Sequence, residues 1–281
     1  MREHPTREAS LSVALDTAVR ASELAYDVRG SGPTLILFHG LVHRRHAWDP
    51  VVDRLAKHRT VITVDLPGHG ESPDVDESGD VLAESLAELE QFVLEMSRPG
   101  EKPHLAGNSL GGYAALELAA RGYAKSATAL SPAGFAVGQW DHRRSVAMFT
   151  GLRAAARLLG PDNVAAAVQN PALRALLLGP FYANGWRADV DACAIDVRSL
   201  VENRVVNHAA NATLTFTSPV DDRCPITVAW GRRDLILPIY QANGVTRVFP
   251  HARVIKVAGL GHVPMPDNPE LVASLLLAGS A

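Results

Sequence analysis

Gly107-Asn108-Ser109-Leu110-Gly111-Gly112 is the stretch of sequence that decides the fold. It lies between a short apolar run, residues 104–106, and a strongly helical run, residues 113–120. A serine within Gly-x-Ser-x-Gly at a strand-to-helix junction is typical of a nucleophile elbow, a turn so sharp that the serine backbone is strained. Glycine stands two positions before and two positions after the serine because a Cβ there would come too close to other backbone. We expect the Ser109 hydroxyl at the edge of a sheet, with the Leu110 N–H placed to stabilise an oxyanion.

The rest of the chain alternates between apolar runs typical of strands and runs typical of helices. We predict strands at residues 11–15, 24–28, 34–38, 61–64, 104–106, 127–130, 226–230 and 254–257, and helices over 49–57, 82–96, 113–120, 239–248 and from 269. Such alternation predicts an α/β fold with a mostly parallel sheet and flanking helices. Residues 134–217 break the pattern, because they contain Ala- and Leu-rich helical stretches without strands. We therefore predict a core formed by residues 1–133 and 218–281, with residues 134–217 inserted as a helical cap over the carboxyl edge of the sheet.

Composition excludes several classes of protein. The chain has 281 residues, of which 47% are hydrophobic, so a sizeable core is available. The net charge is -3 with both signs interspersed, which gives no electrostatic case for nucleic acid. Residues 1–10 lack the apolar core of a signal peptide, and no stretch reaches the length of a membrane span. Only Cys193 and Cys224 are present, so we expect no disulfide scaffold. These features predict a cytoplasmic protein with a small-molecule substrate, and they leave the oligomeric state open.

A nucleophilic serine needs a base, and His262 is the candidate. The chain has eleven histidines, so the presence of one carries no information. His262 stands out because residues 261–264 follow the last predicted strand and precede the terminal helix. That loop lies at the same sheet edge as the elbow. An imidazole near Ser109 can take the hydroxyl proton as the oxygen attacks.

The base needs a carboxylate that orients it, and Asp234 is the candidate. It follows the strand that ends at Trp230, which places it at the same edge. The order Ser, Asp, His along the chain is the one expected for this arrangement. The alternatives are Asp221 and Asp222, which precede that strand, and Asp65, which follows a different strand and fits a structural loop role better.

A second oxyanion donor is expected in the loop after residues 34–38. His39-Gly40 begins that loop, and the backbone N–H of Leu41 is the candidate donor. Gly40 allows the backbone to approach a substrate closely. His39 is interpreted as a hydrogen-bonding strut for the loop, with no direct part in catalysis.

With these motifs in place, the sequence resembles the α/β-hydrolase-fold serine hydrolases, in the group of capped esterases, C–C hydrolases and haloperoxidase-like proteins. The segments that carry the resemblance, besides the elbow, are residues 38–40, 65–72, 231–238 and 261–264. The resemblance implies a hydrolase that cleaves a small-to-medium carboxylic ester, or a related acyl compound, through an acyl-enzyme, without a cofactor or metal. Haloalkane dehalogenases and epoxide hydrolases of this fold use an Asp at the elbow, so Ser109 disfavours them.

Two other functions stay open. The Gly-Asn-Ser-x-Gly-Gly elbow is common among C–C bond hydrolases of aromatic catabolism, whose substrates are β-diketone-like. Those enzymes usually carry a Trp directly after the catalytic His, where this chain has Val263, and a small Gly-rich oxyanion loop, where residues 41–46 are bulky and basic. A ligand-sensing or signalling protein that retains the triad is also compatible with these motifs.

The cap and the loop after Leu41 offer further candidates. In the cap, Trp140, Phe149 and Trp186 could bind substrate, or they could form the core of the cap itself. The arginines of residues 143–157 either form a solvated face or recognise an acidic group on the substrate. His43 and His46 lie close together in the chain, but no carboxylate or Cys cluster flanks them, so we expect no metal site.

Overall fold

The computed structural model describes residues 22–206, 208, 212–217 and 223–281, and the strand predicted at residues 11–15 lies outside them. Among the described residues, seven strands form one sheet in the order β1-β3-β2-β4-β5-β6-β7. All neighbouring pairs are parallel except β1 with β3, which confirms the predicted mostly parallel sheet. The strands are β1 (Tyr26–Arg29), β2 (Thr34–Phe38), β3 (Thr60–Val64), β4 (His104–Asn108), β5 (Ser126–Leu130), β6 (Ile226–Gly231) and β7 (Arg253–Val257).

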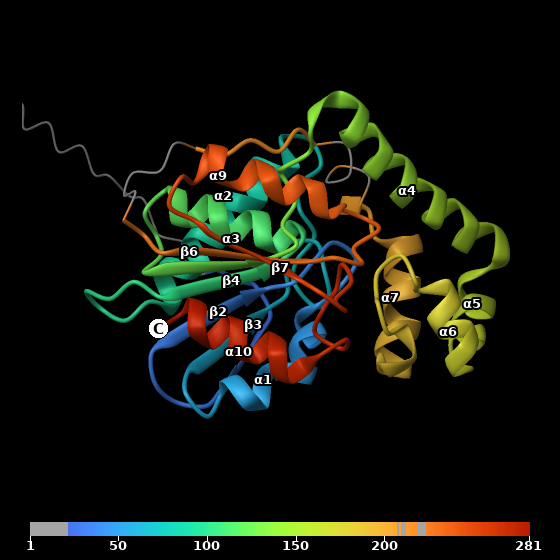
Figure 1. The fold of residues 1–281 in the computed structure, drawn as a ribbon, viewed down its shortest axis with the longest axis horizontal. Coiled ribbons are helices and arrows are strands. Elements are labelled where there is room, and N and C mark those ends of the chain that lie inside the picture. The colour runs from blue at the N-terminus through green and yellow to red at the C-terminus, as the bar shows by residue number, and fades with distance from the viewer. Residues whose placement is uncertain (1–21, 207, 209–211, 218–222) are drawn as a thin grey trace, which may run out of the picture.

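Helices cover both faces of this sheet (Figure 1). One face carries α1 (Asp49–Leu55) and α10 (Pro269–Gly279), and the other carries α2 (Val81–Met96), α3 (Leu110–Ala120) and α9 (Val245–Val248). Every residue of β4 and β5 is buried, as expected for central parallel strands enclosed on both faces. The predicted helix over 239–248 divides into a 3₁₀ helix, η3 (Ile239–Gly244), and the single turn α9. The first part is 3₁₀ because the Gln241 N–H donates to the carbonyl of Pro238, three residues earlier.

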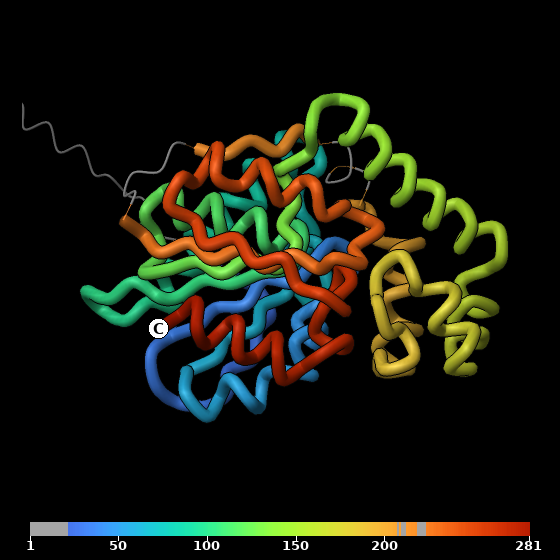
Figure 2. Tube along the Cα trace, in the orientation of Figure 1, coloured from blue at the N-terminus to red at the C-terminus, as the bar shows by residue number. Residues whose placement is uncertain are grey.

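Between β5 and β6 the described residues contain helices and no strand. They include α4 (Gly138–Leu159), α5 (Pro161–Ala167), α6 (Pro171–Leu177), the short η2 (Gly185–Arg187) and α7 (Val190–Glu202). Proline at the first position begins α5 and α6, and the Asn170 and Asp189 side chains cap α6 and α7. Figures 1 and 2 show these helices beyond one end of the sheet, the position expected of a cap. The cap boundaries at residues 134 and 217 stay a prediction.

No helix among the described residues is both long enough and apolar enough to cross a membrane.

Candidate active site

The turn between β4 and α3 has the strained geometry of a nucleophile elbow. Ser109 has φ 56° and ψ −116°, a left-handed conformation that side chains other than glycine rarely adopt. A Cβ on Gly107 would lie 2.1 Å from the Gly111 carbonyl oxygen, and a Cβ on Gly111 would lie 2.2 Å from the Phe38 carbonyl oxygen. Any side chain at Gly107 or Gly111 would therefore collide with neighbouring backbone, so both positions require glycine.

We expect Gly111→Ala to lower the free energy of unfolding by at least about 2–3 kcal/mol, because the added methyl group meets rigid backbone. Chemical denaturation of the variant measures this loss. Gly151→Ala is the matched control, since a Cβ at this exposed position of α4 meets nothing within 4 Å. The control should be neutral or stabilising by up to about 1 kcal/mol. Equal stability of the two variants would show that the close contact at Gly111 is not present in solution.

The structure brings Ser109, His262 and Asp234 together from three separate segments. The Ser109 Oγ lies 2.9 Å from His262 Nε2, and His262 Nδ1 lies 2.9 Å from Asp234 Oδ2. The imidazole and the carboxylate are both almost completely buried. With a proton on Nδ1, the imidazole donates to the carboxylate and leaves Nε2 free to accept the serine proton. The arrangement can therefore activate a hydroxyl nucleophile.

The Asp234 carboxylate is held in one orientation by its own loop. Its second oxygen, Oδ1, accepts hydrogen bonds from the backbone N–H groups of Ile236 at 2.9 Å and Leu237 at 2.8 Å. The loop is in turn tied to β6 through the Trp230 Nε1–H, which donates to the Leu237 carbonyl. Oδ2 is thus left facing the imidazole.

Asn108 and Asp267 position the histidine loop, and reasoning from the sequence missed both roles. The Asn108 side-chain amide donates to the carbonyls of Leu130 and His262, at 2.9 and 2.8 Å. This links the elbow strand directly to the backbone of the base. The only feature of the sequence that could have indicated this role is the position of Asn108 next to Ser109.

The Asp267 carboxylate connects the histidine loop to the segment before η2. It accepts from the backbone N–H groups of Gly261, Ala183 and Asn184 at 2.8, 3.1 and 2.6 Å. Burial raises the pKa of Asp267, and the three N–H donors oppose that rise. Two of its partners lie more than 80 residues away in the chain, so no local pattern could have identified it.

The two expected oxyanion donors lie on the same cavity as Ser109. Leu41 and Leu110 both line it, and no described residue accepts a hydrogen bond from either backbone N–H. A Cβ on Gly40 would lie 3.3 Å from the Ser109 Cβ, so the loop runs directly against the elbow. The approach of the Gly40 backbone to a substrate stays a prediction.

His39 has the strut geometry that the sequence suggested. Its Nε2 accepts from the Leu66 N–H at 2.9 Å, so Nδ1 carries the proton and donates to the Gly40 carbonyl at 2.8 Å. Burial, and then the neighbouring His69, lower the pKa of His39 well below its ordinary value. The neutral ring braces the loop and does not reach the cavity lining.

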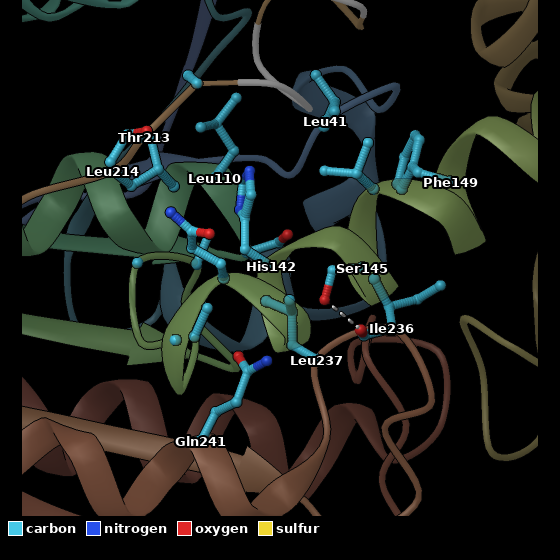
Figure 3. Close-up of a pocket in the computed structure, with 18 residues that line it drawn as sticks. Leu41, Leu110, His142, Ser145, Phe149, Thr213, Leu214, Ile236, Leu237 and Gln241 are labelled. Atoms are coloured by element: carbon cyan, nitrogen blue, oxygen red, sulfur yellow. Dashed lines mark hydrogen bonds between the residues drawn. The ribbon is translucent and has the colours of Figure 1, made fainter.

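Ser109 and one face of helix α4 line a cavity of about 430 Å³. Figure 3 shows the side chains that surround it. Its walls come from the elbow, the loop at Leu41, one face of α4, residues 212–214 and the loop after Asp234. Most of the lining is apolar, and no Arg, Lys, Asp or Glu is among the described residues that form it. The polar side chains of the lining, apart from Ser109, are Gln139, His142, Ser145, Thr213 and Gln241.

Of the three aromatic residues expected to bind substrate, only Phe149 is in this lining. Trp140 is 79% exposed and Trp186 is 52% exposed, and neither is among the residues that surround the cavity. Lining residues recur along α4 at 139, 142, 146 and 149, so they share one helical face, and position 140 points elsewhere. Trp186 lies in η2, and the Arg187 Cζ atom lies over its ring at 4.8 Å from the ring centre.

The cap arginines also contact backbone rather than the cavity. Arg144 donates to the Leu235 carbonyl at 2.9 Å, Arg153 to the Asn203 carbonyl at 2.8 Å and Arg157 to the Val201 carbonyl at 3.0 Å. None of the three is among the described residues that line the cavity. They join segments within the cap and between α4 and the loop after Asp234.

The remaining candidates have other surroundings. Asp65 is completely buried, pairs with Arg45 and accepts from the Glu71 N–H, which is the structural loop role suggested for it. Asp221 and Asp222 lie outside the described residues. His43 joins the loop at Leu41 to α7, because its ring contacts the Leu41 carbonyl at 3.2 Å and the carboxylate of Asp196 on α7 at 3.6 Å.

Comparison with known proteins agrees with this architecture. Residues 35–275 match the model of the alpha/beta hydrolase family. An uncharacterized protein of Mycobacterium bovis is 26% identical over 280 residues, covering 94% of this chain and 80% of that protein. A pimeloyl-[acyl-carrier protein] methyl ester esterase of Xanthomonas oryzae pv. oryzae is 30% identical over 264 residues, covering 89% and 96%. The structure of 2-hydroxy-6-oxo-6-phenylhexa-2,4-dienoate hydrolase from Rhodococcus sp. strain RHA1 superimposes with a TM-score of 0.69 at 17% identity, covering 91% and 94%.

Proposed function

The chain belongs to the alpha/beta hydrolase family, and on this premise we propose that it hydrolyses a small-to-medium carboxylic ester, or a related acyl compound, through an acyl-enzyme on Ser109. The observation that carries the proposal is the hydrogen-bonded series Ser109–His262–Asp234 beside a mostly apolar cavity. The curated relative that is named as a methyl ester esterase supports ester chemistry.

In the first half of the reaction the Ser109 Oγ attacks the ester carbonyl carbon while His262 Nε2 takes the hydroxyl proton. The Asp234 carboxylate stabilises the imidazolium that forms. The carbonyl oxygen becomes an oxyanion, which the N–H groups of Leu41 and Leu110 stabilise. The carbon–oxygen bond to the alcohol then breaks, and His262 gives its proton to the departing alcohol.

In the second half, water replaces the alcohol. His262 takes a proton from the water as the oxygen attacks the acyl-enzyme carbonyl. When the second tetrahedral intermediate collapses, the acid leaves and Ser109 regains its proton from His262. These steps need no cofactor or metal.

The uncharged cavity favours a neutral substrate over one with an acidic group. A carboxylate on the substrate would be expected to meet an arginine or lysine. The described lining contains neither, and Arg144, Arg153 and Arg157 bond to backbone carbonyls instead. These contacts count against recognition of an acidic group, and the burial of Arg153 shows that the arginines do not simply form a solvated face.

A panel of p-nitrophenyl esters of graded chain length tests the proposal, together with labelling by a fluorophosphonate probe. We expect turnover of at least the shorter esters and a covalent adduct on Ser109 in the mass spectrum. A folded protein that forms no adduct and hydrolyses no ester would contradict the proposal and would favour the ligand-sensing alternative. Cleavage of a β-diketone-like compound without ester turnover would favour the C–C hydrolase.

We expect Phe149→Ala to shift the preferred acyl chain length, because this side chain bounds the cavity while the two tryptophans do not. The change in selectivity should be about 1–3 kcal/mol between adjacent members of the ester panel. Trp140→Ala is the matched control, and its profile of kcat/KM against chain length should equal that of the wild type. A shift in the Trp140 variant and none in the Phe149 variant would place the substrate elsewhere.

A further inference from the structure

His142 is a polar side chain of the cavity to which the proposed mechanism assigns no role. It lies on α4, is partly buried, and lines the cavity together with Ser109 and Leu110. Figure 3 shows its imidazole projecting among the other lining side chains. It is also the one titratable side chain among the described lining residues, Ser109 aside.

Two charged neighbours of His142 on α4 already have hydrogen-bond partners in the protein. Asp141 accepts from the Val137 N–H and from the side chains of Tyr240 and Gln241, and Arg144 donates to the Leu235 carbonyl. By contrast, neither ring nitrogen of His142 hydrogen-bonds to a described residue. Because the imidazole is partly exposed on the cavity and makes no hydrogen bond to a described residue, both of its nitrogens are available to a ligand.

The side chains around His142 indicate what kind of ligand would bind there. A neutral imidazole offers one donor and one acceptor, which matches a hydroxyl group or, through the donor, a carbonyl. The other polar side chains of the lining are amides and hydroxyls, and no arginine or lysine among the described lining residues could pair with a carboxylate. An uncharged hydrogen-bonding group therefore fits this wall better than an acid.

We propose that His142 forms a binding subsite for an uncharged hydrogen-bonding group, a hydroxyl or a carbonyl, carried by the part of the substrate that fills the cavity. This subsite rests on the proposed ester hydrolysis and refines its substrate class. The substrate is then an ester with a second, neutral polar group along an otherwise apolar chain. His142 determines specificity and takes no part in proton transfer at Ser109.

The test compares two methyl esters of the same length, methyl 6-hydroxyhexanoate and methyl heptanoate, which differ by a hydroxyl in place of a methyl group. Because the alcohol part is only methanol, the acyl chain must fill the cavity. The readout is the ratio of kcat/KM for the two esters within one variant, which cancels any general loss of active enzyme. Homologues with four to eight carbons locate the best hydroxyl position.

We expect His142→Phe, which keeps a ring and removes its nitrogens, to lower the ratio for the hydroxy ester about tenfold. His142→Gln retains a donor and an acceptor and should keep part of the preference. Arg143→Ala, an exposed neighbour on α4 outside the lining, should leave the ratio unchanged. The same ratio in the wild type and in His142→Phe, at every chain length, would overturn the subsite.

Two further results separate the subsite from the proposed function. Monomethyl adipate carries a carboxylate at the same end, and if the wild type prefers it while His142→Phe does not, the group that binds is anionic and the proposed neutral class is wrong. If the wild type hydrolyses none of these esters and no p-nitrophenyl ester, the ester hydrolase itself fails. Turnover of the esters with an unaltered ratio rejects the subsite alone.

Discussion

The Ser109→Ala variant is expected to fold like the wild type and to lose at least about 10³-fold in kcat. The hydroxyl is the attacking atom in the proposed mechanism, and no other side chain hydrogen-bonds to His262 Nε2 among the described residues. Alanine keeps a Cβ, so the backbone strain at φ 56° stays the same and the stability should change little. Hydrolysis of a p-nitrophenyl ester measures the loss, and thermal unfolding checks the fold.

Ser274→Ala is the control for this experiment. Ser274 is exposed on α10, and its hydroxyl donates only to the Glu270 carbonyl one turn earlier. Its loss should leave kcat unchanged. An active Ser109→Ala variant, with labelling by the fluorophosphonate at another residue, would show that the elbow does not carry the nucleophile.

We expect Asp234→Asn to lower kcat by about 10³–10⁴-fold while thermal stability changes little. Asparagine has the same shape, and its oxygen can still accept from the Ile236 and Leu237 N–H groups. Its amide group then faces His262 Nδ1 and donates where the carboxylate accepted. This favours the imidazole with its proton on Nε2, which cannot take the serine proton, and it removes the negative charge that stabilises the imidazolium.

Two other Asp→Asn changes make this result specific. Asp53 is an exposed residue paired with Arg29 on the surface, and its variant should keep full activity. Asp65 holds Arg45 in a buried loop, so Asp65→Asn should mainly lower stability. If Asp234→Asn kept near wild-type activity and Asp65→Asn or Asp222→Asn lost it, Asp234 would not be the carboxylate that orients His262. The assignments of Ser109 and His262 would be unaffected.

The main features of the sheet edge that carries Ser109 could be predicted from the sequence because local rules determine them. The elbow needs glycine at positions 107 and 111 for steric reasons, and this requirement appears as a motif. In a parallel sheet every strand ends at the same edge, so any loop that follows a strand reaches that edge. This rule placed Asp234 and His262 at the edge that carries Ser109. It applies equally to Asp65, which follows β3, and only the pairing of Asp65 with Arg45 and the Glu71 N–H sets that residue apart.

The tertiary structure decided which side chains face the cavity and which hold the loops in place. The sequence could not distinguish among the three aromatics expected to bind substrate, Trp140, Phe149 and Trp186. Only the face that α4 turns toward Ser109 places Phe149 in the lining and leaves Trp140 in solvent. Asp267 collects N–H groups from two segments that meet only after folding. Local patterns encode the turns and the order of strands, since these depend on neighbours in the chain. The packing of the helices between β5 and β6 against the sheet depends on contacts between residues distant in the chain. The same contacts decide that the His142 side chain lies on the cavity.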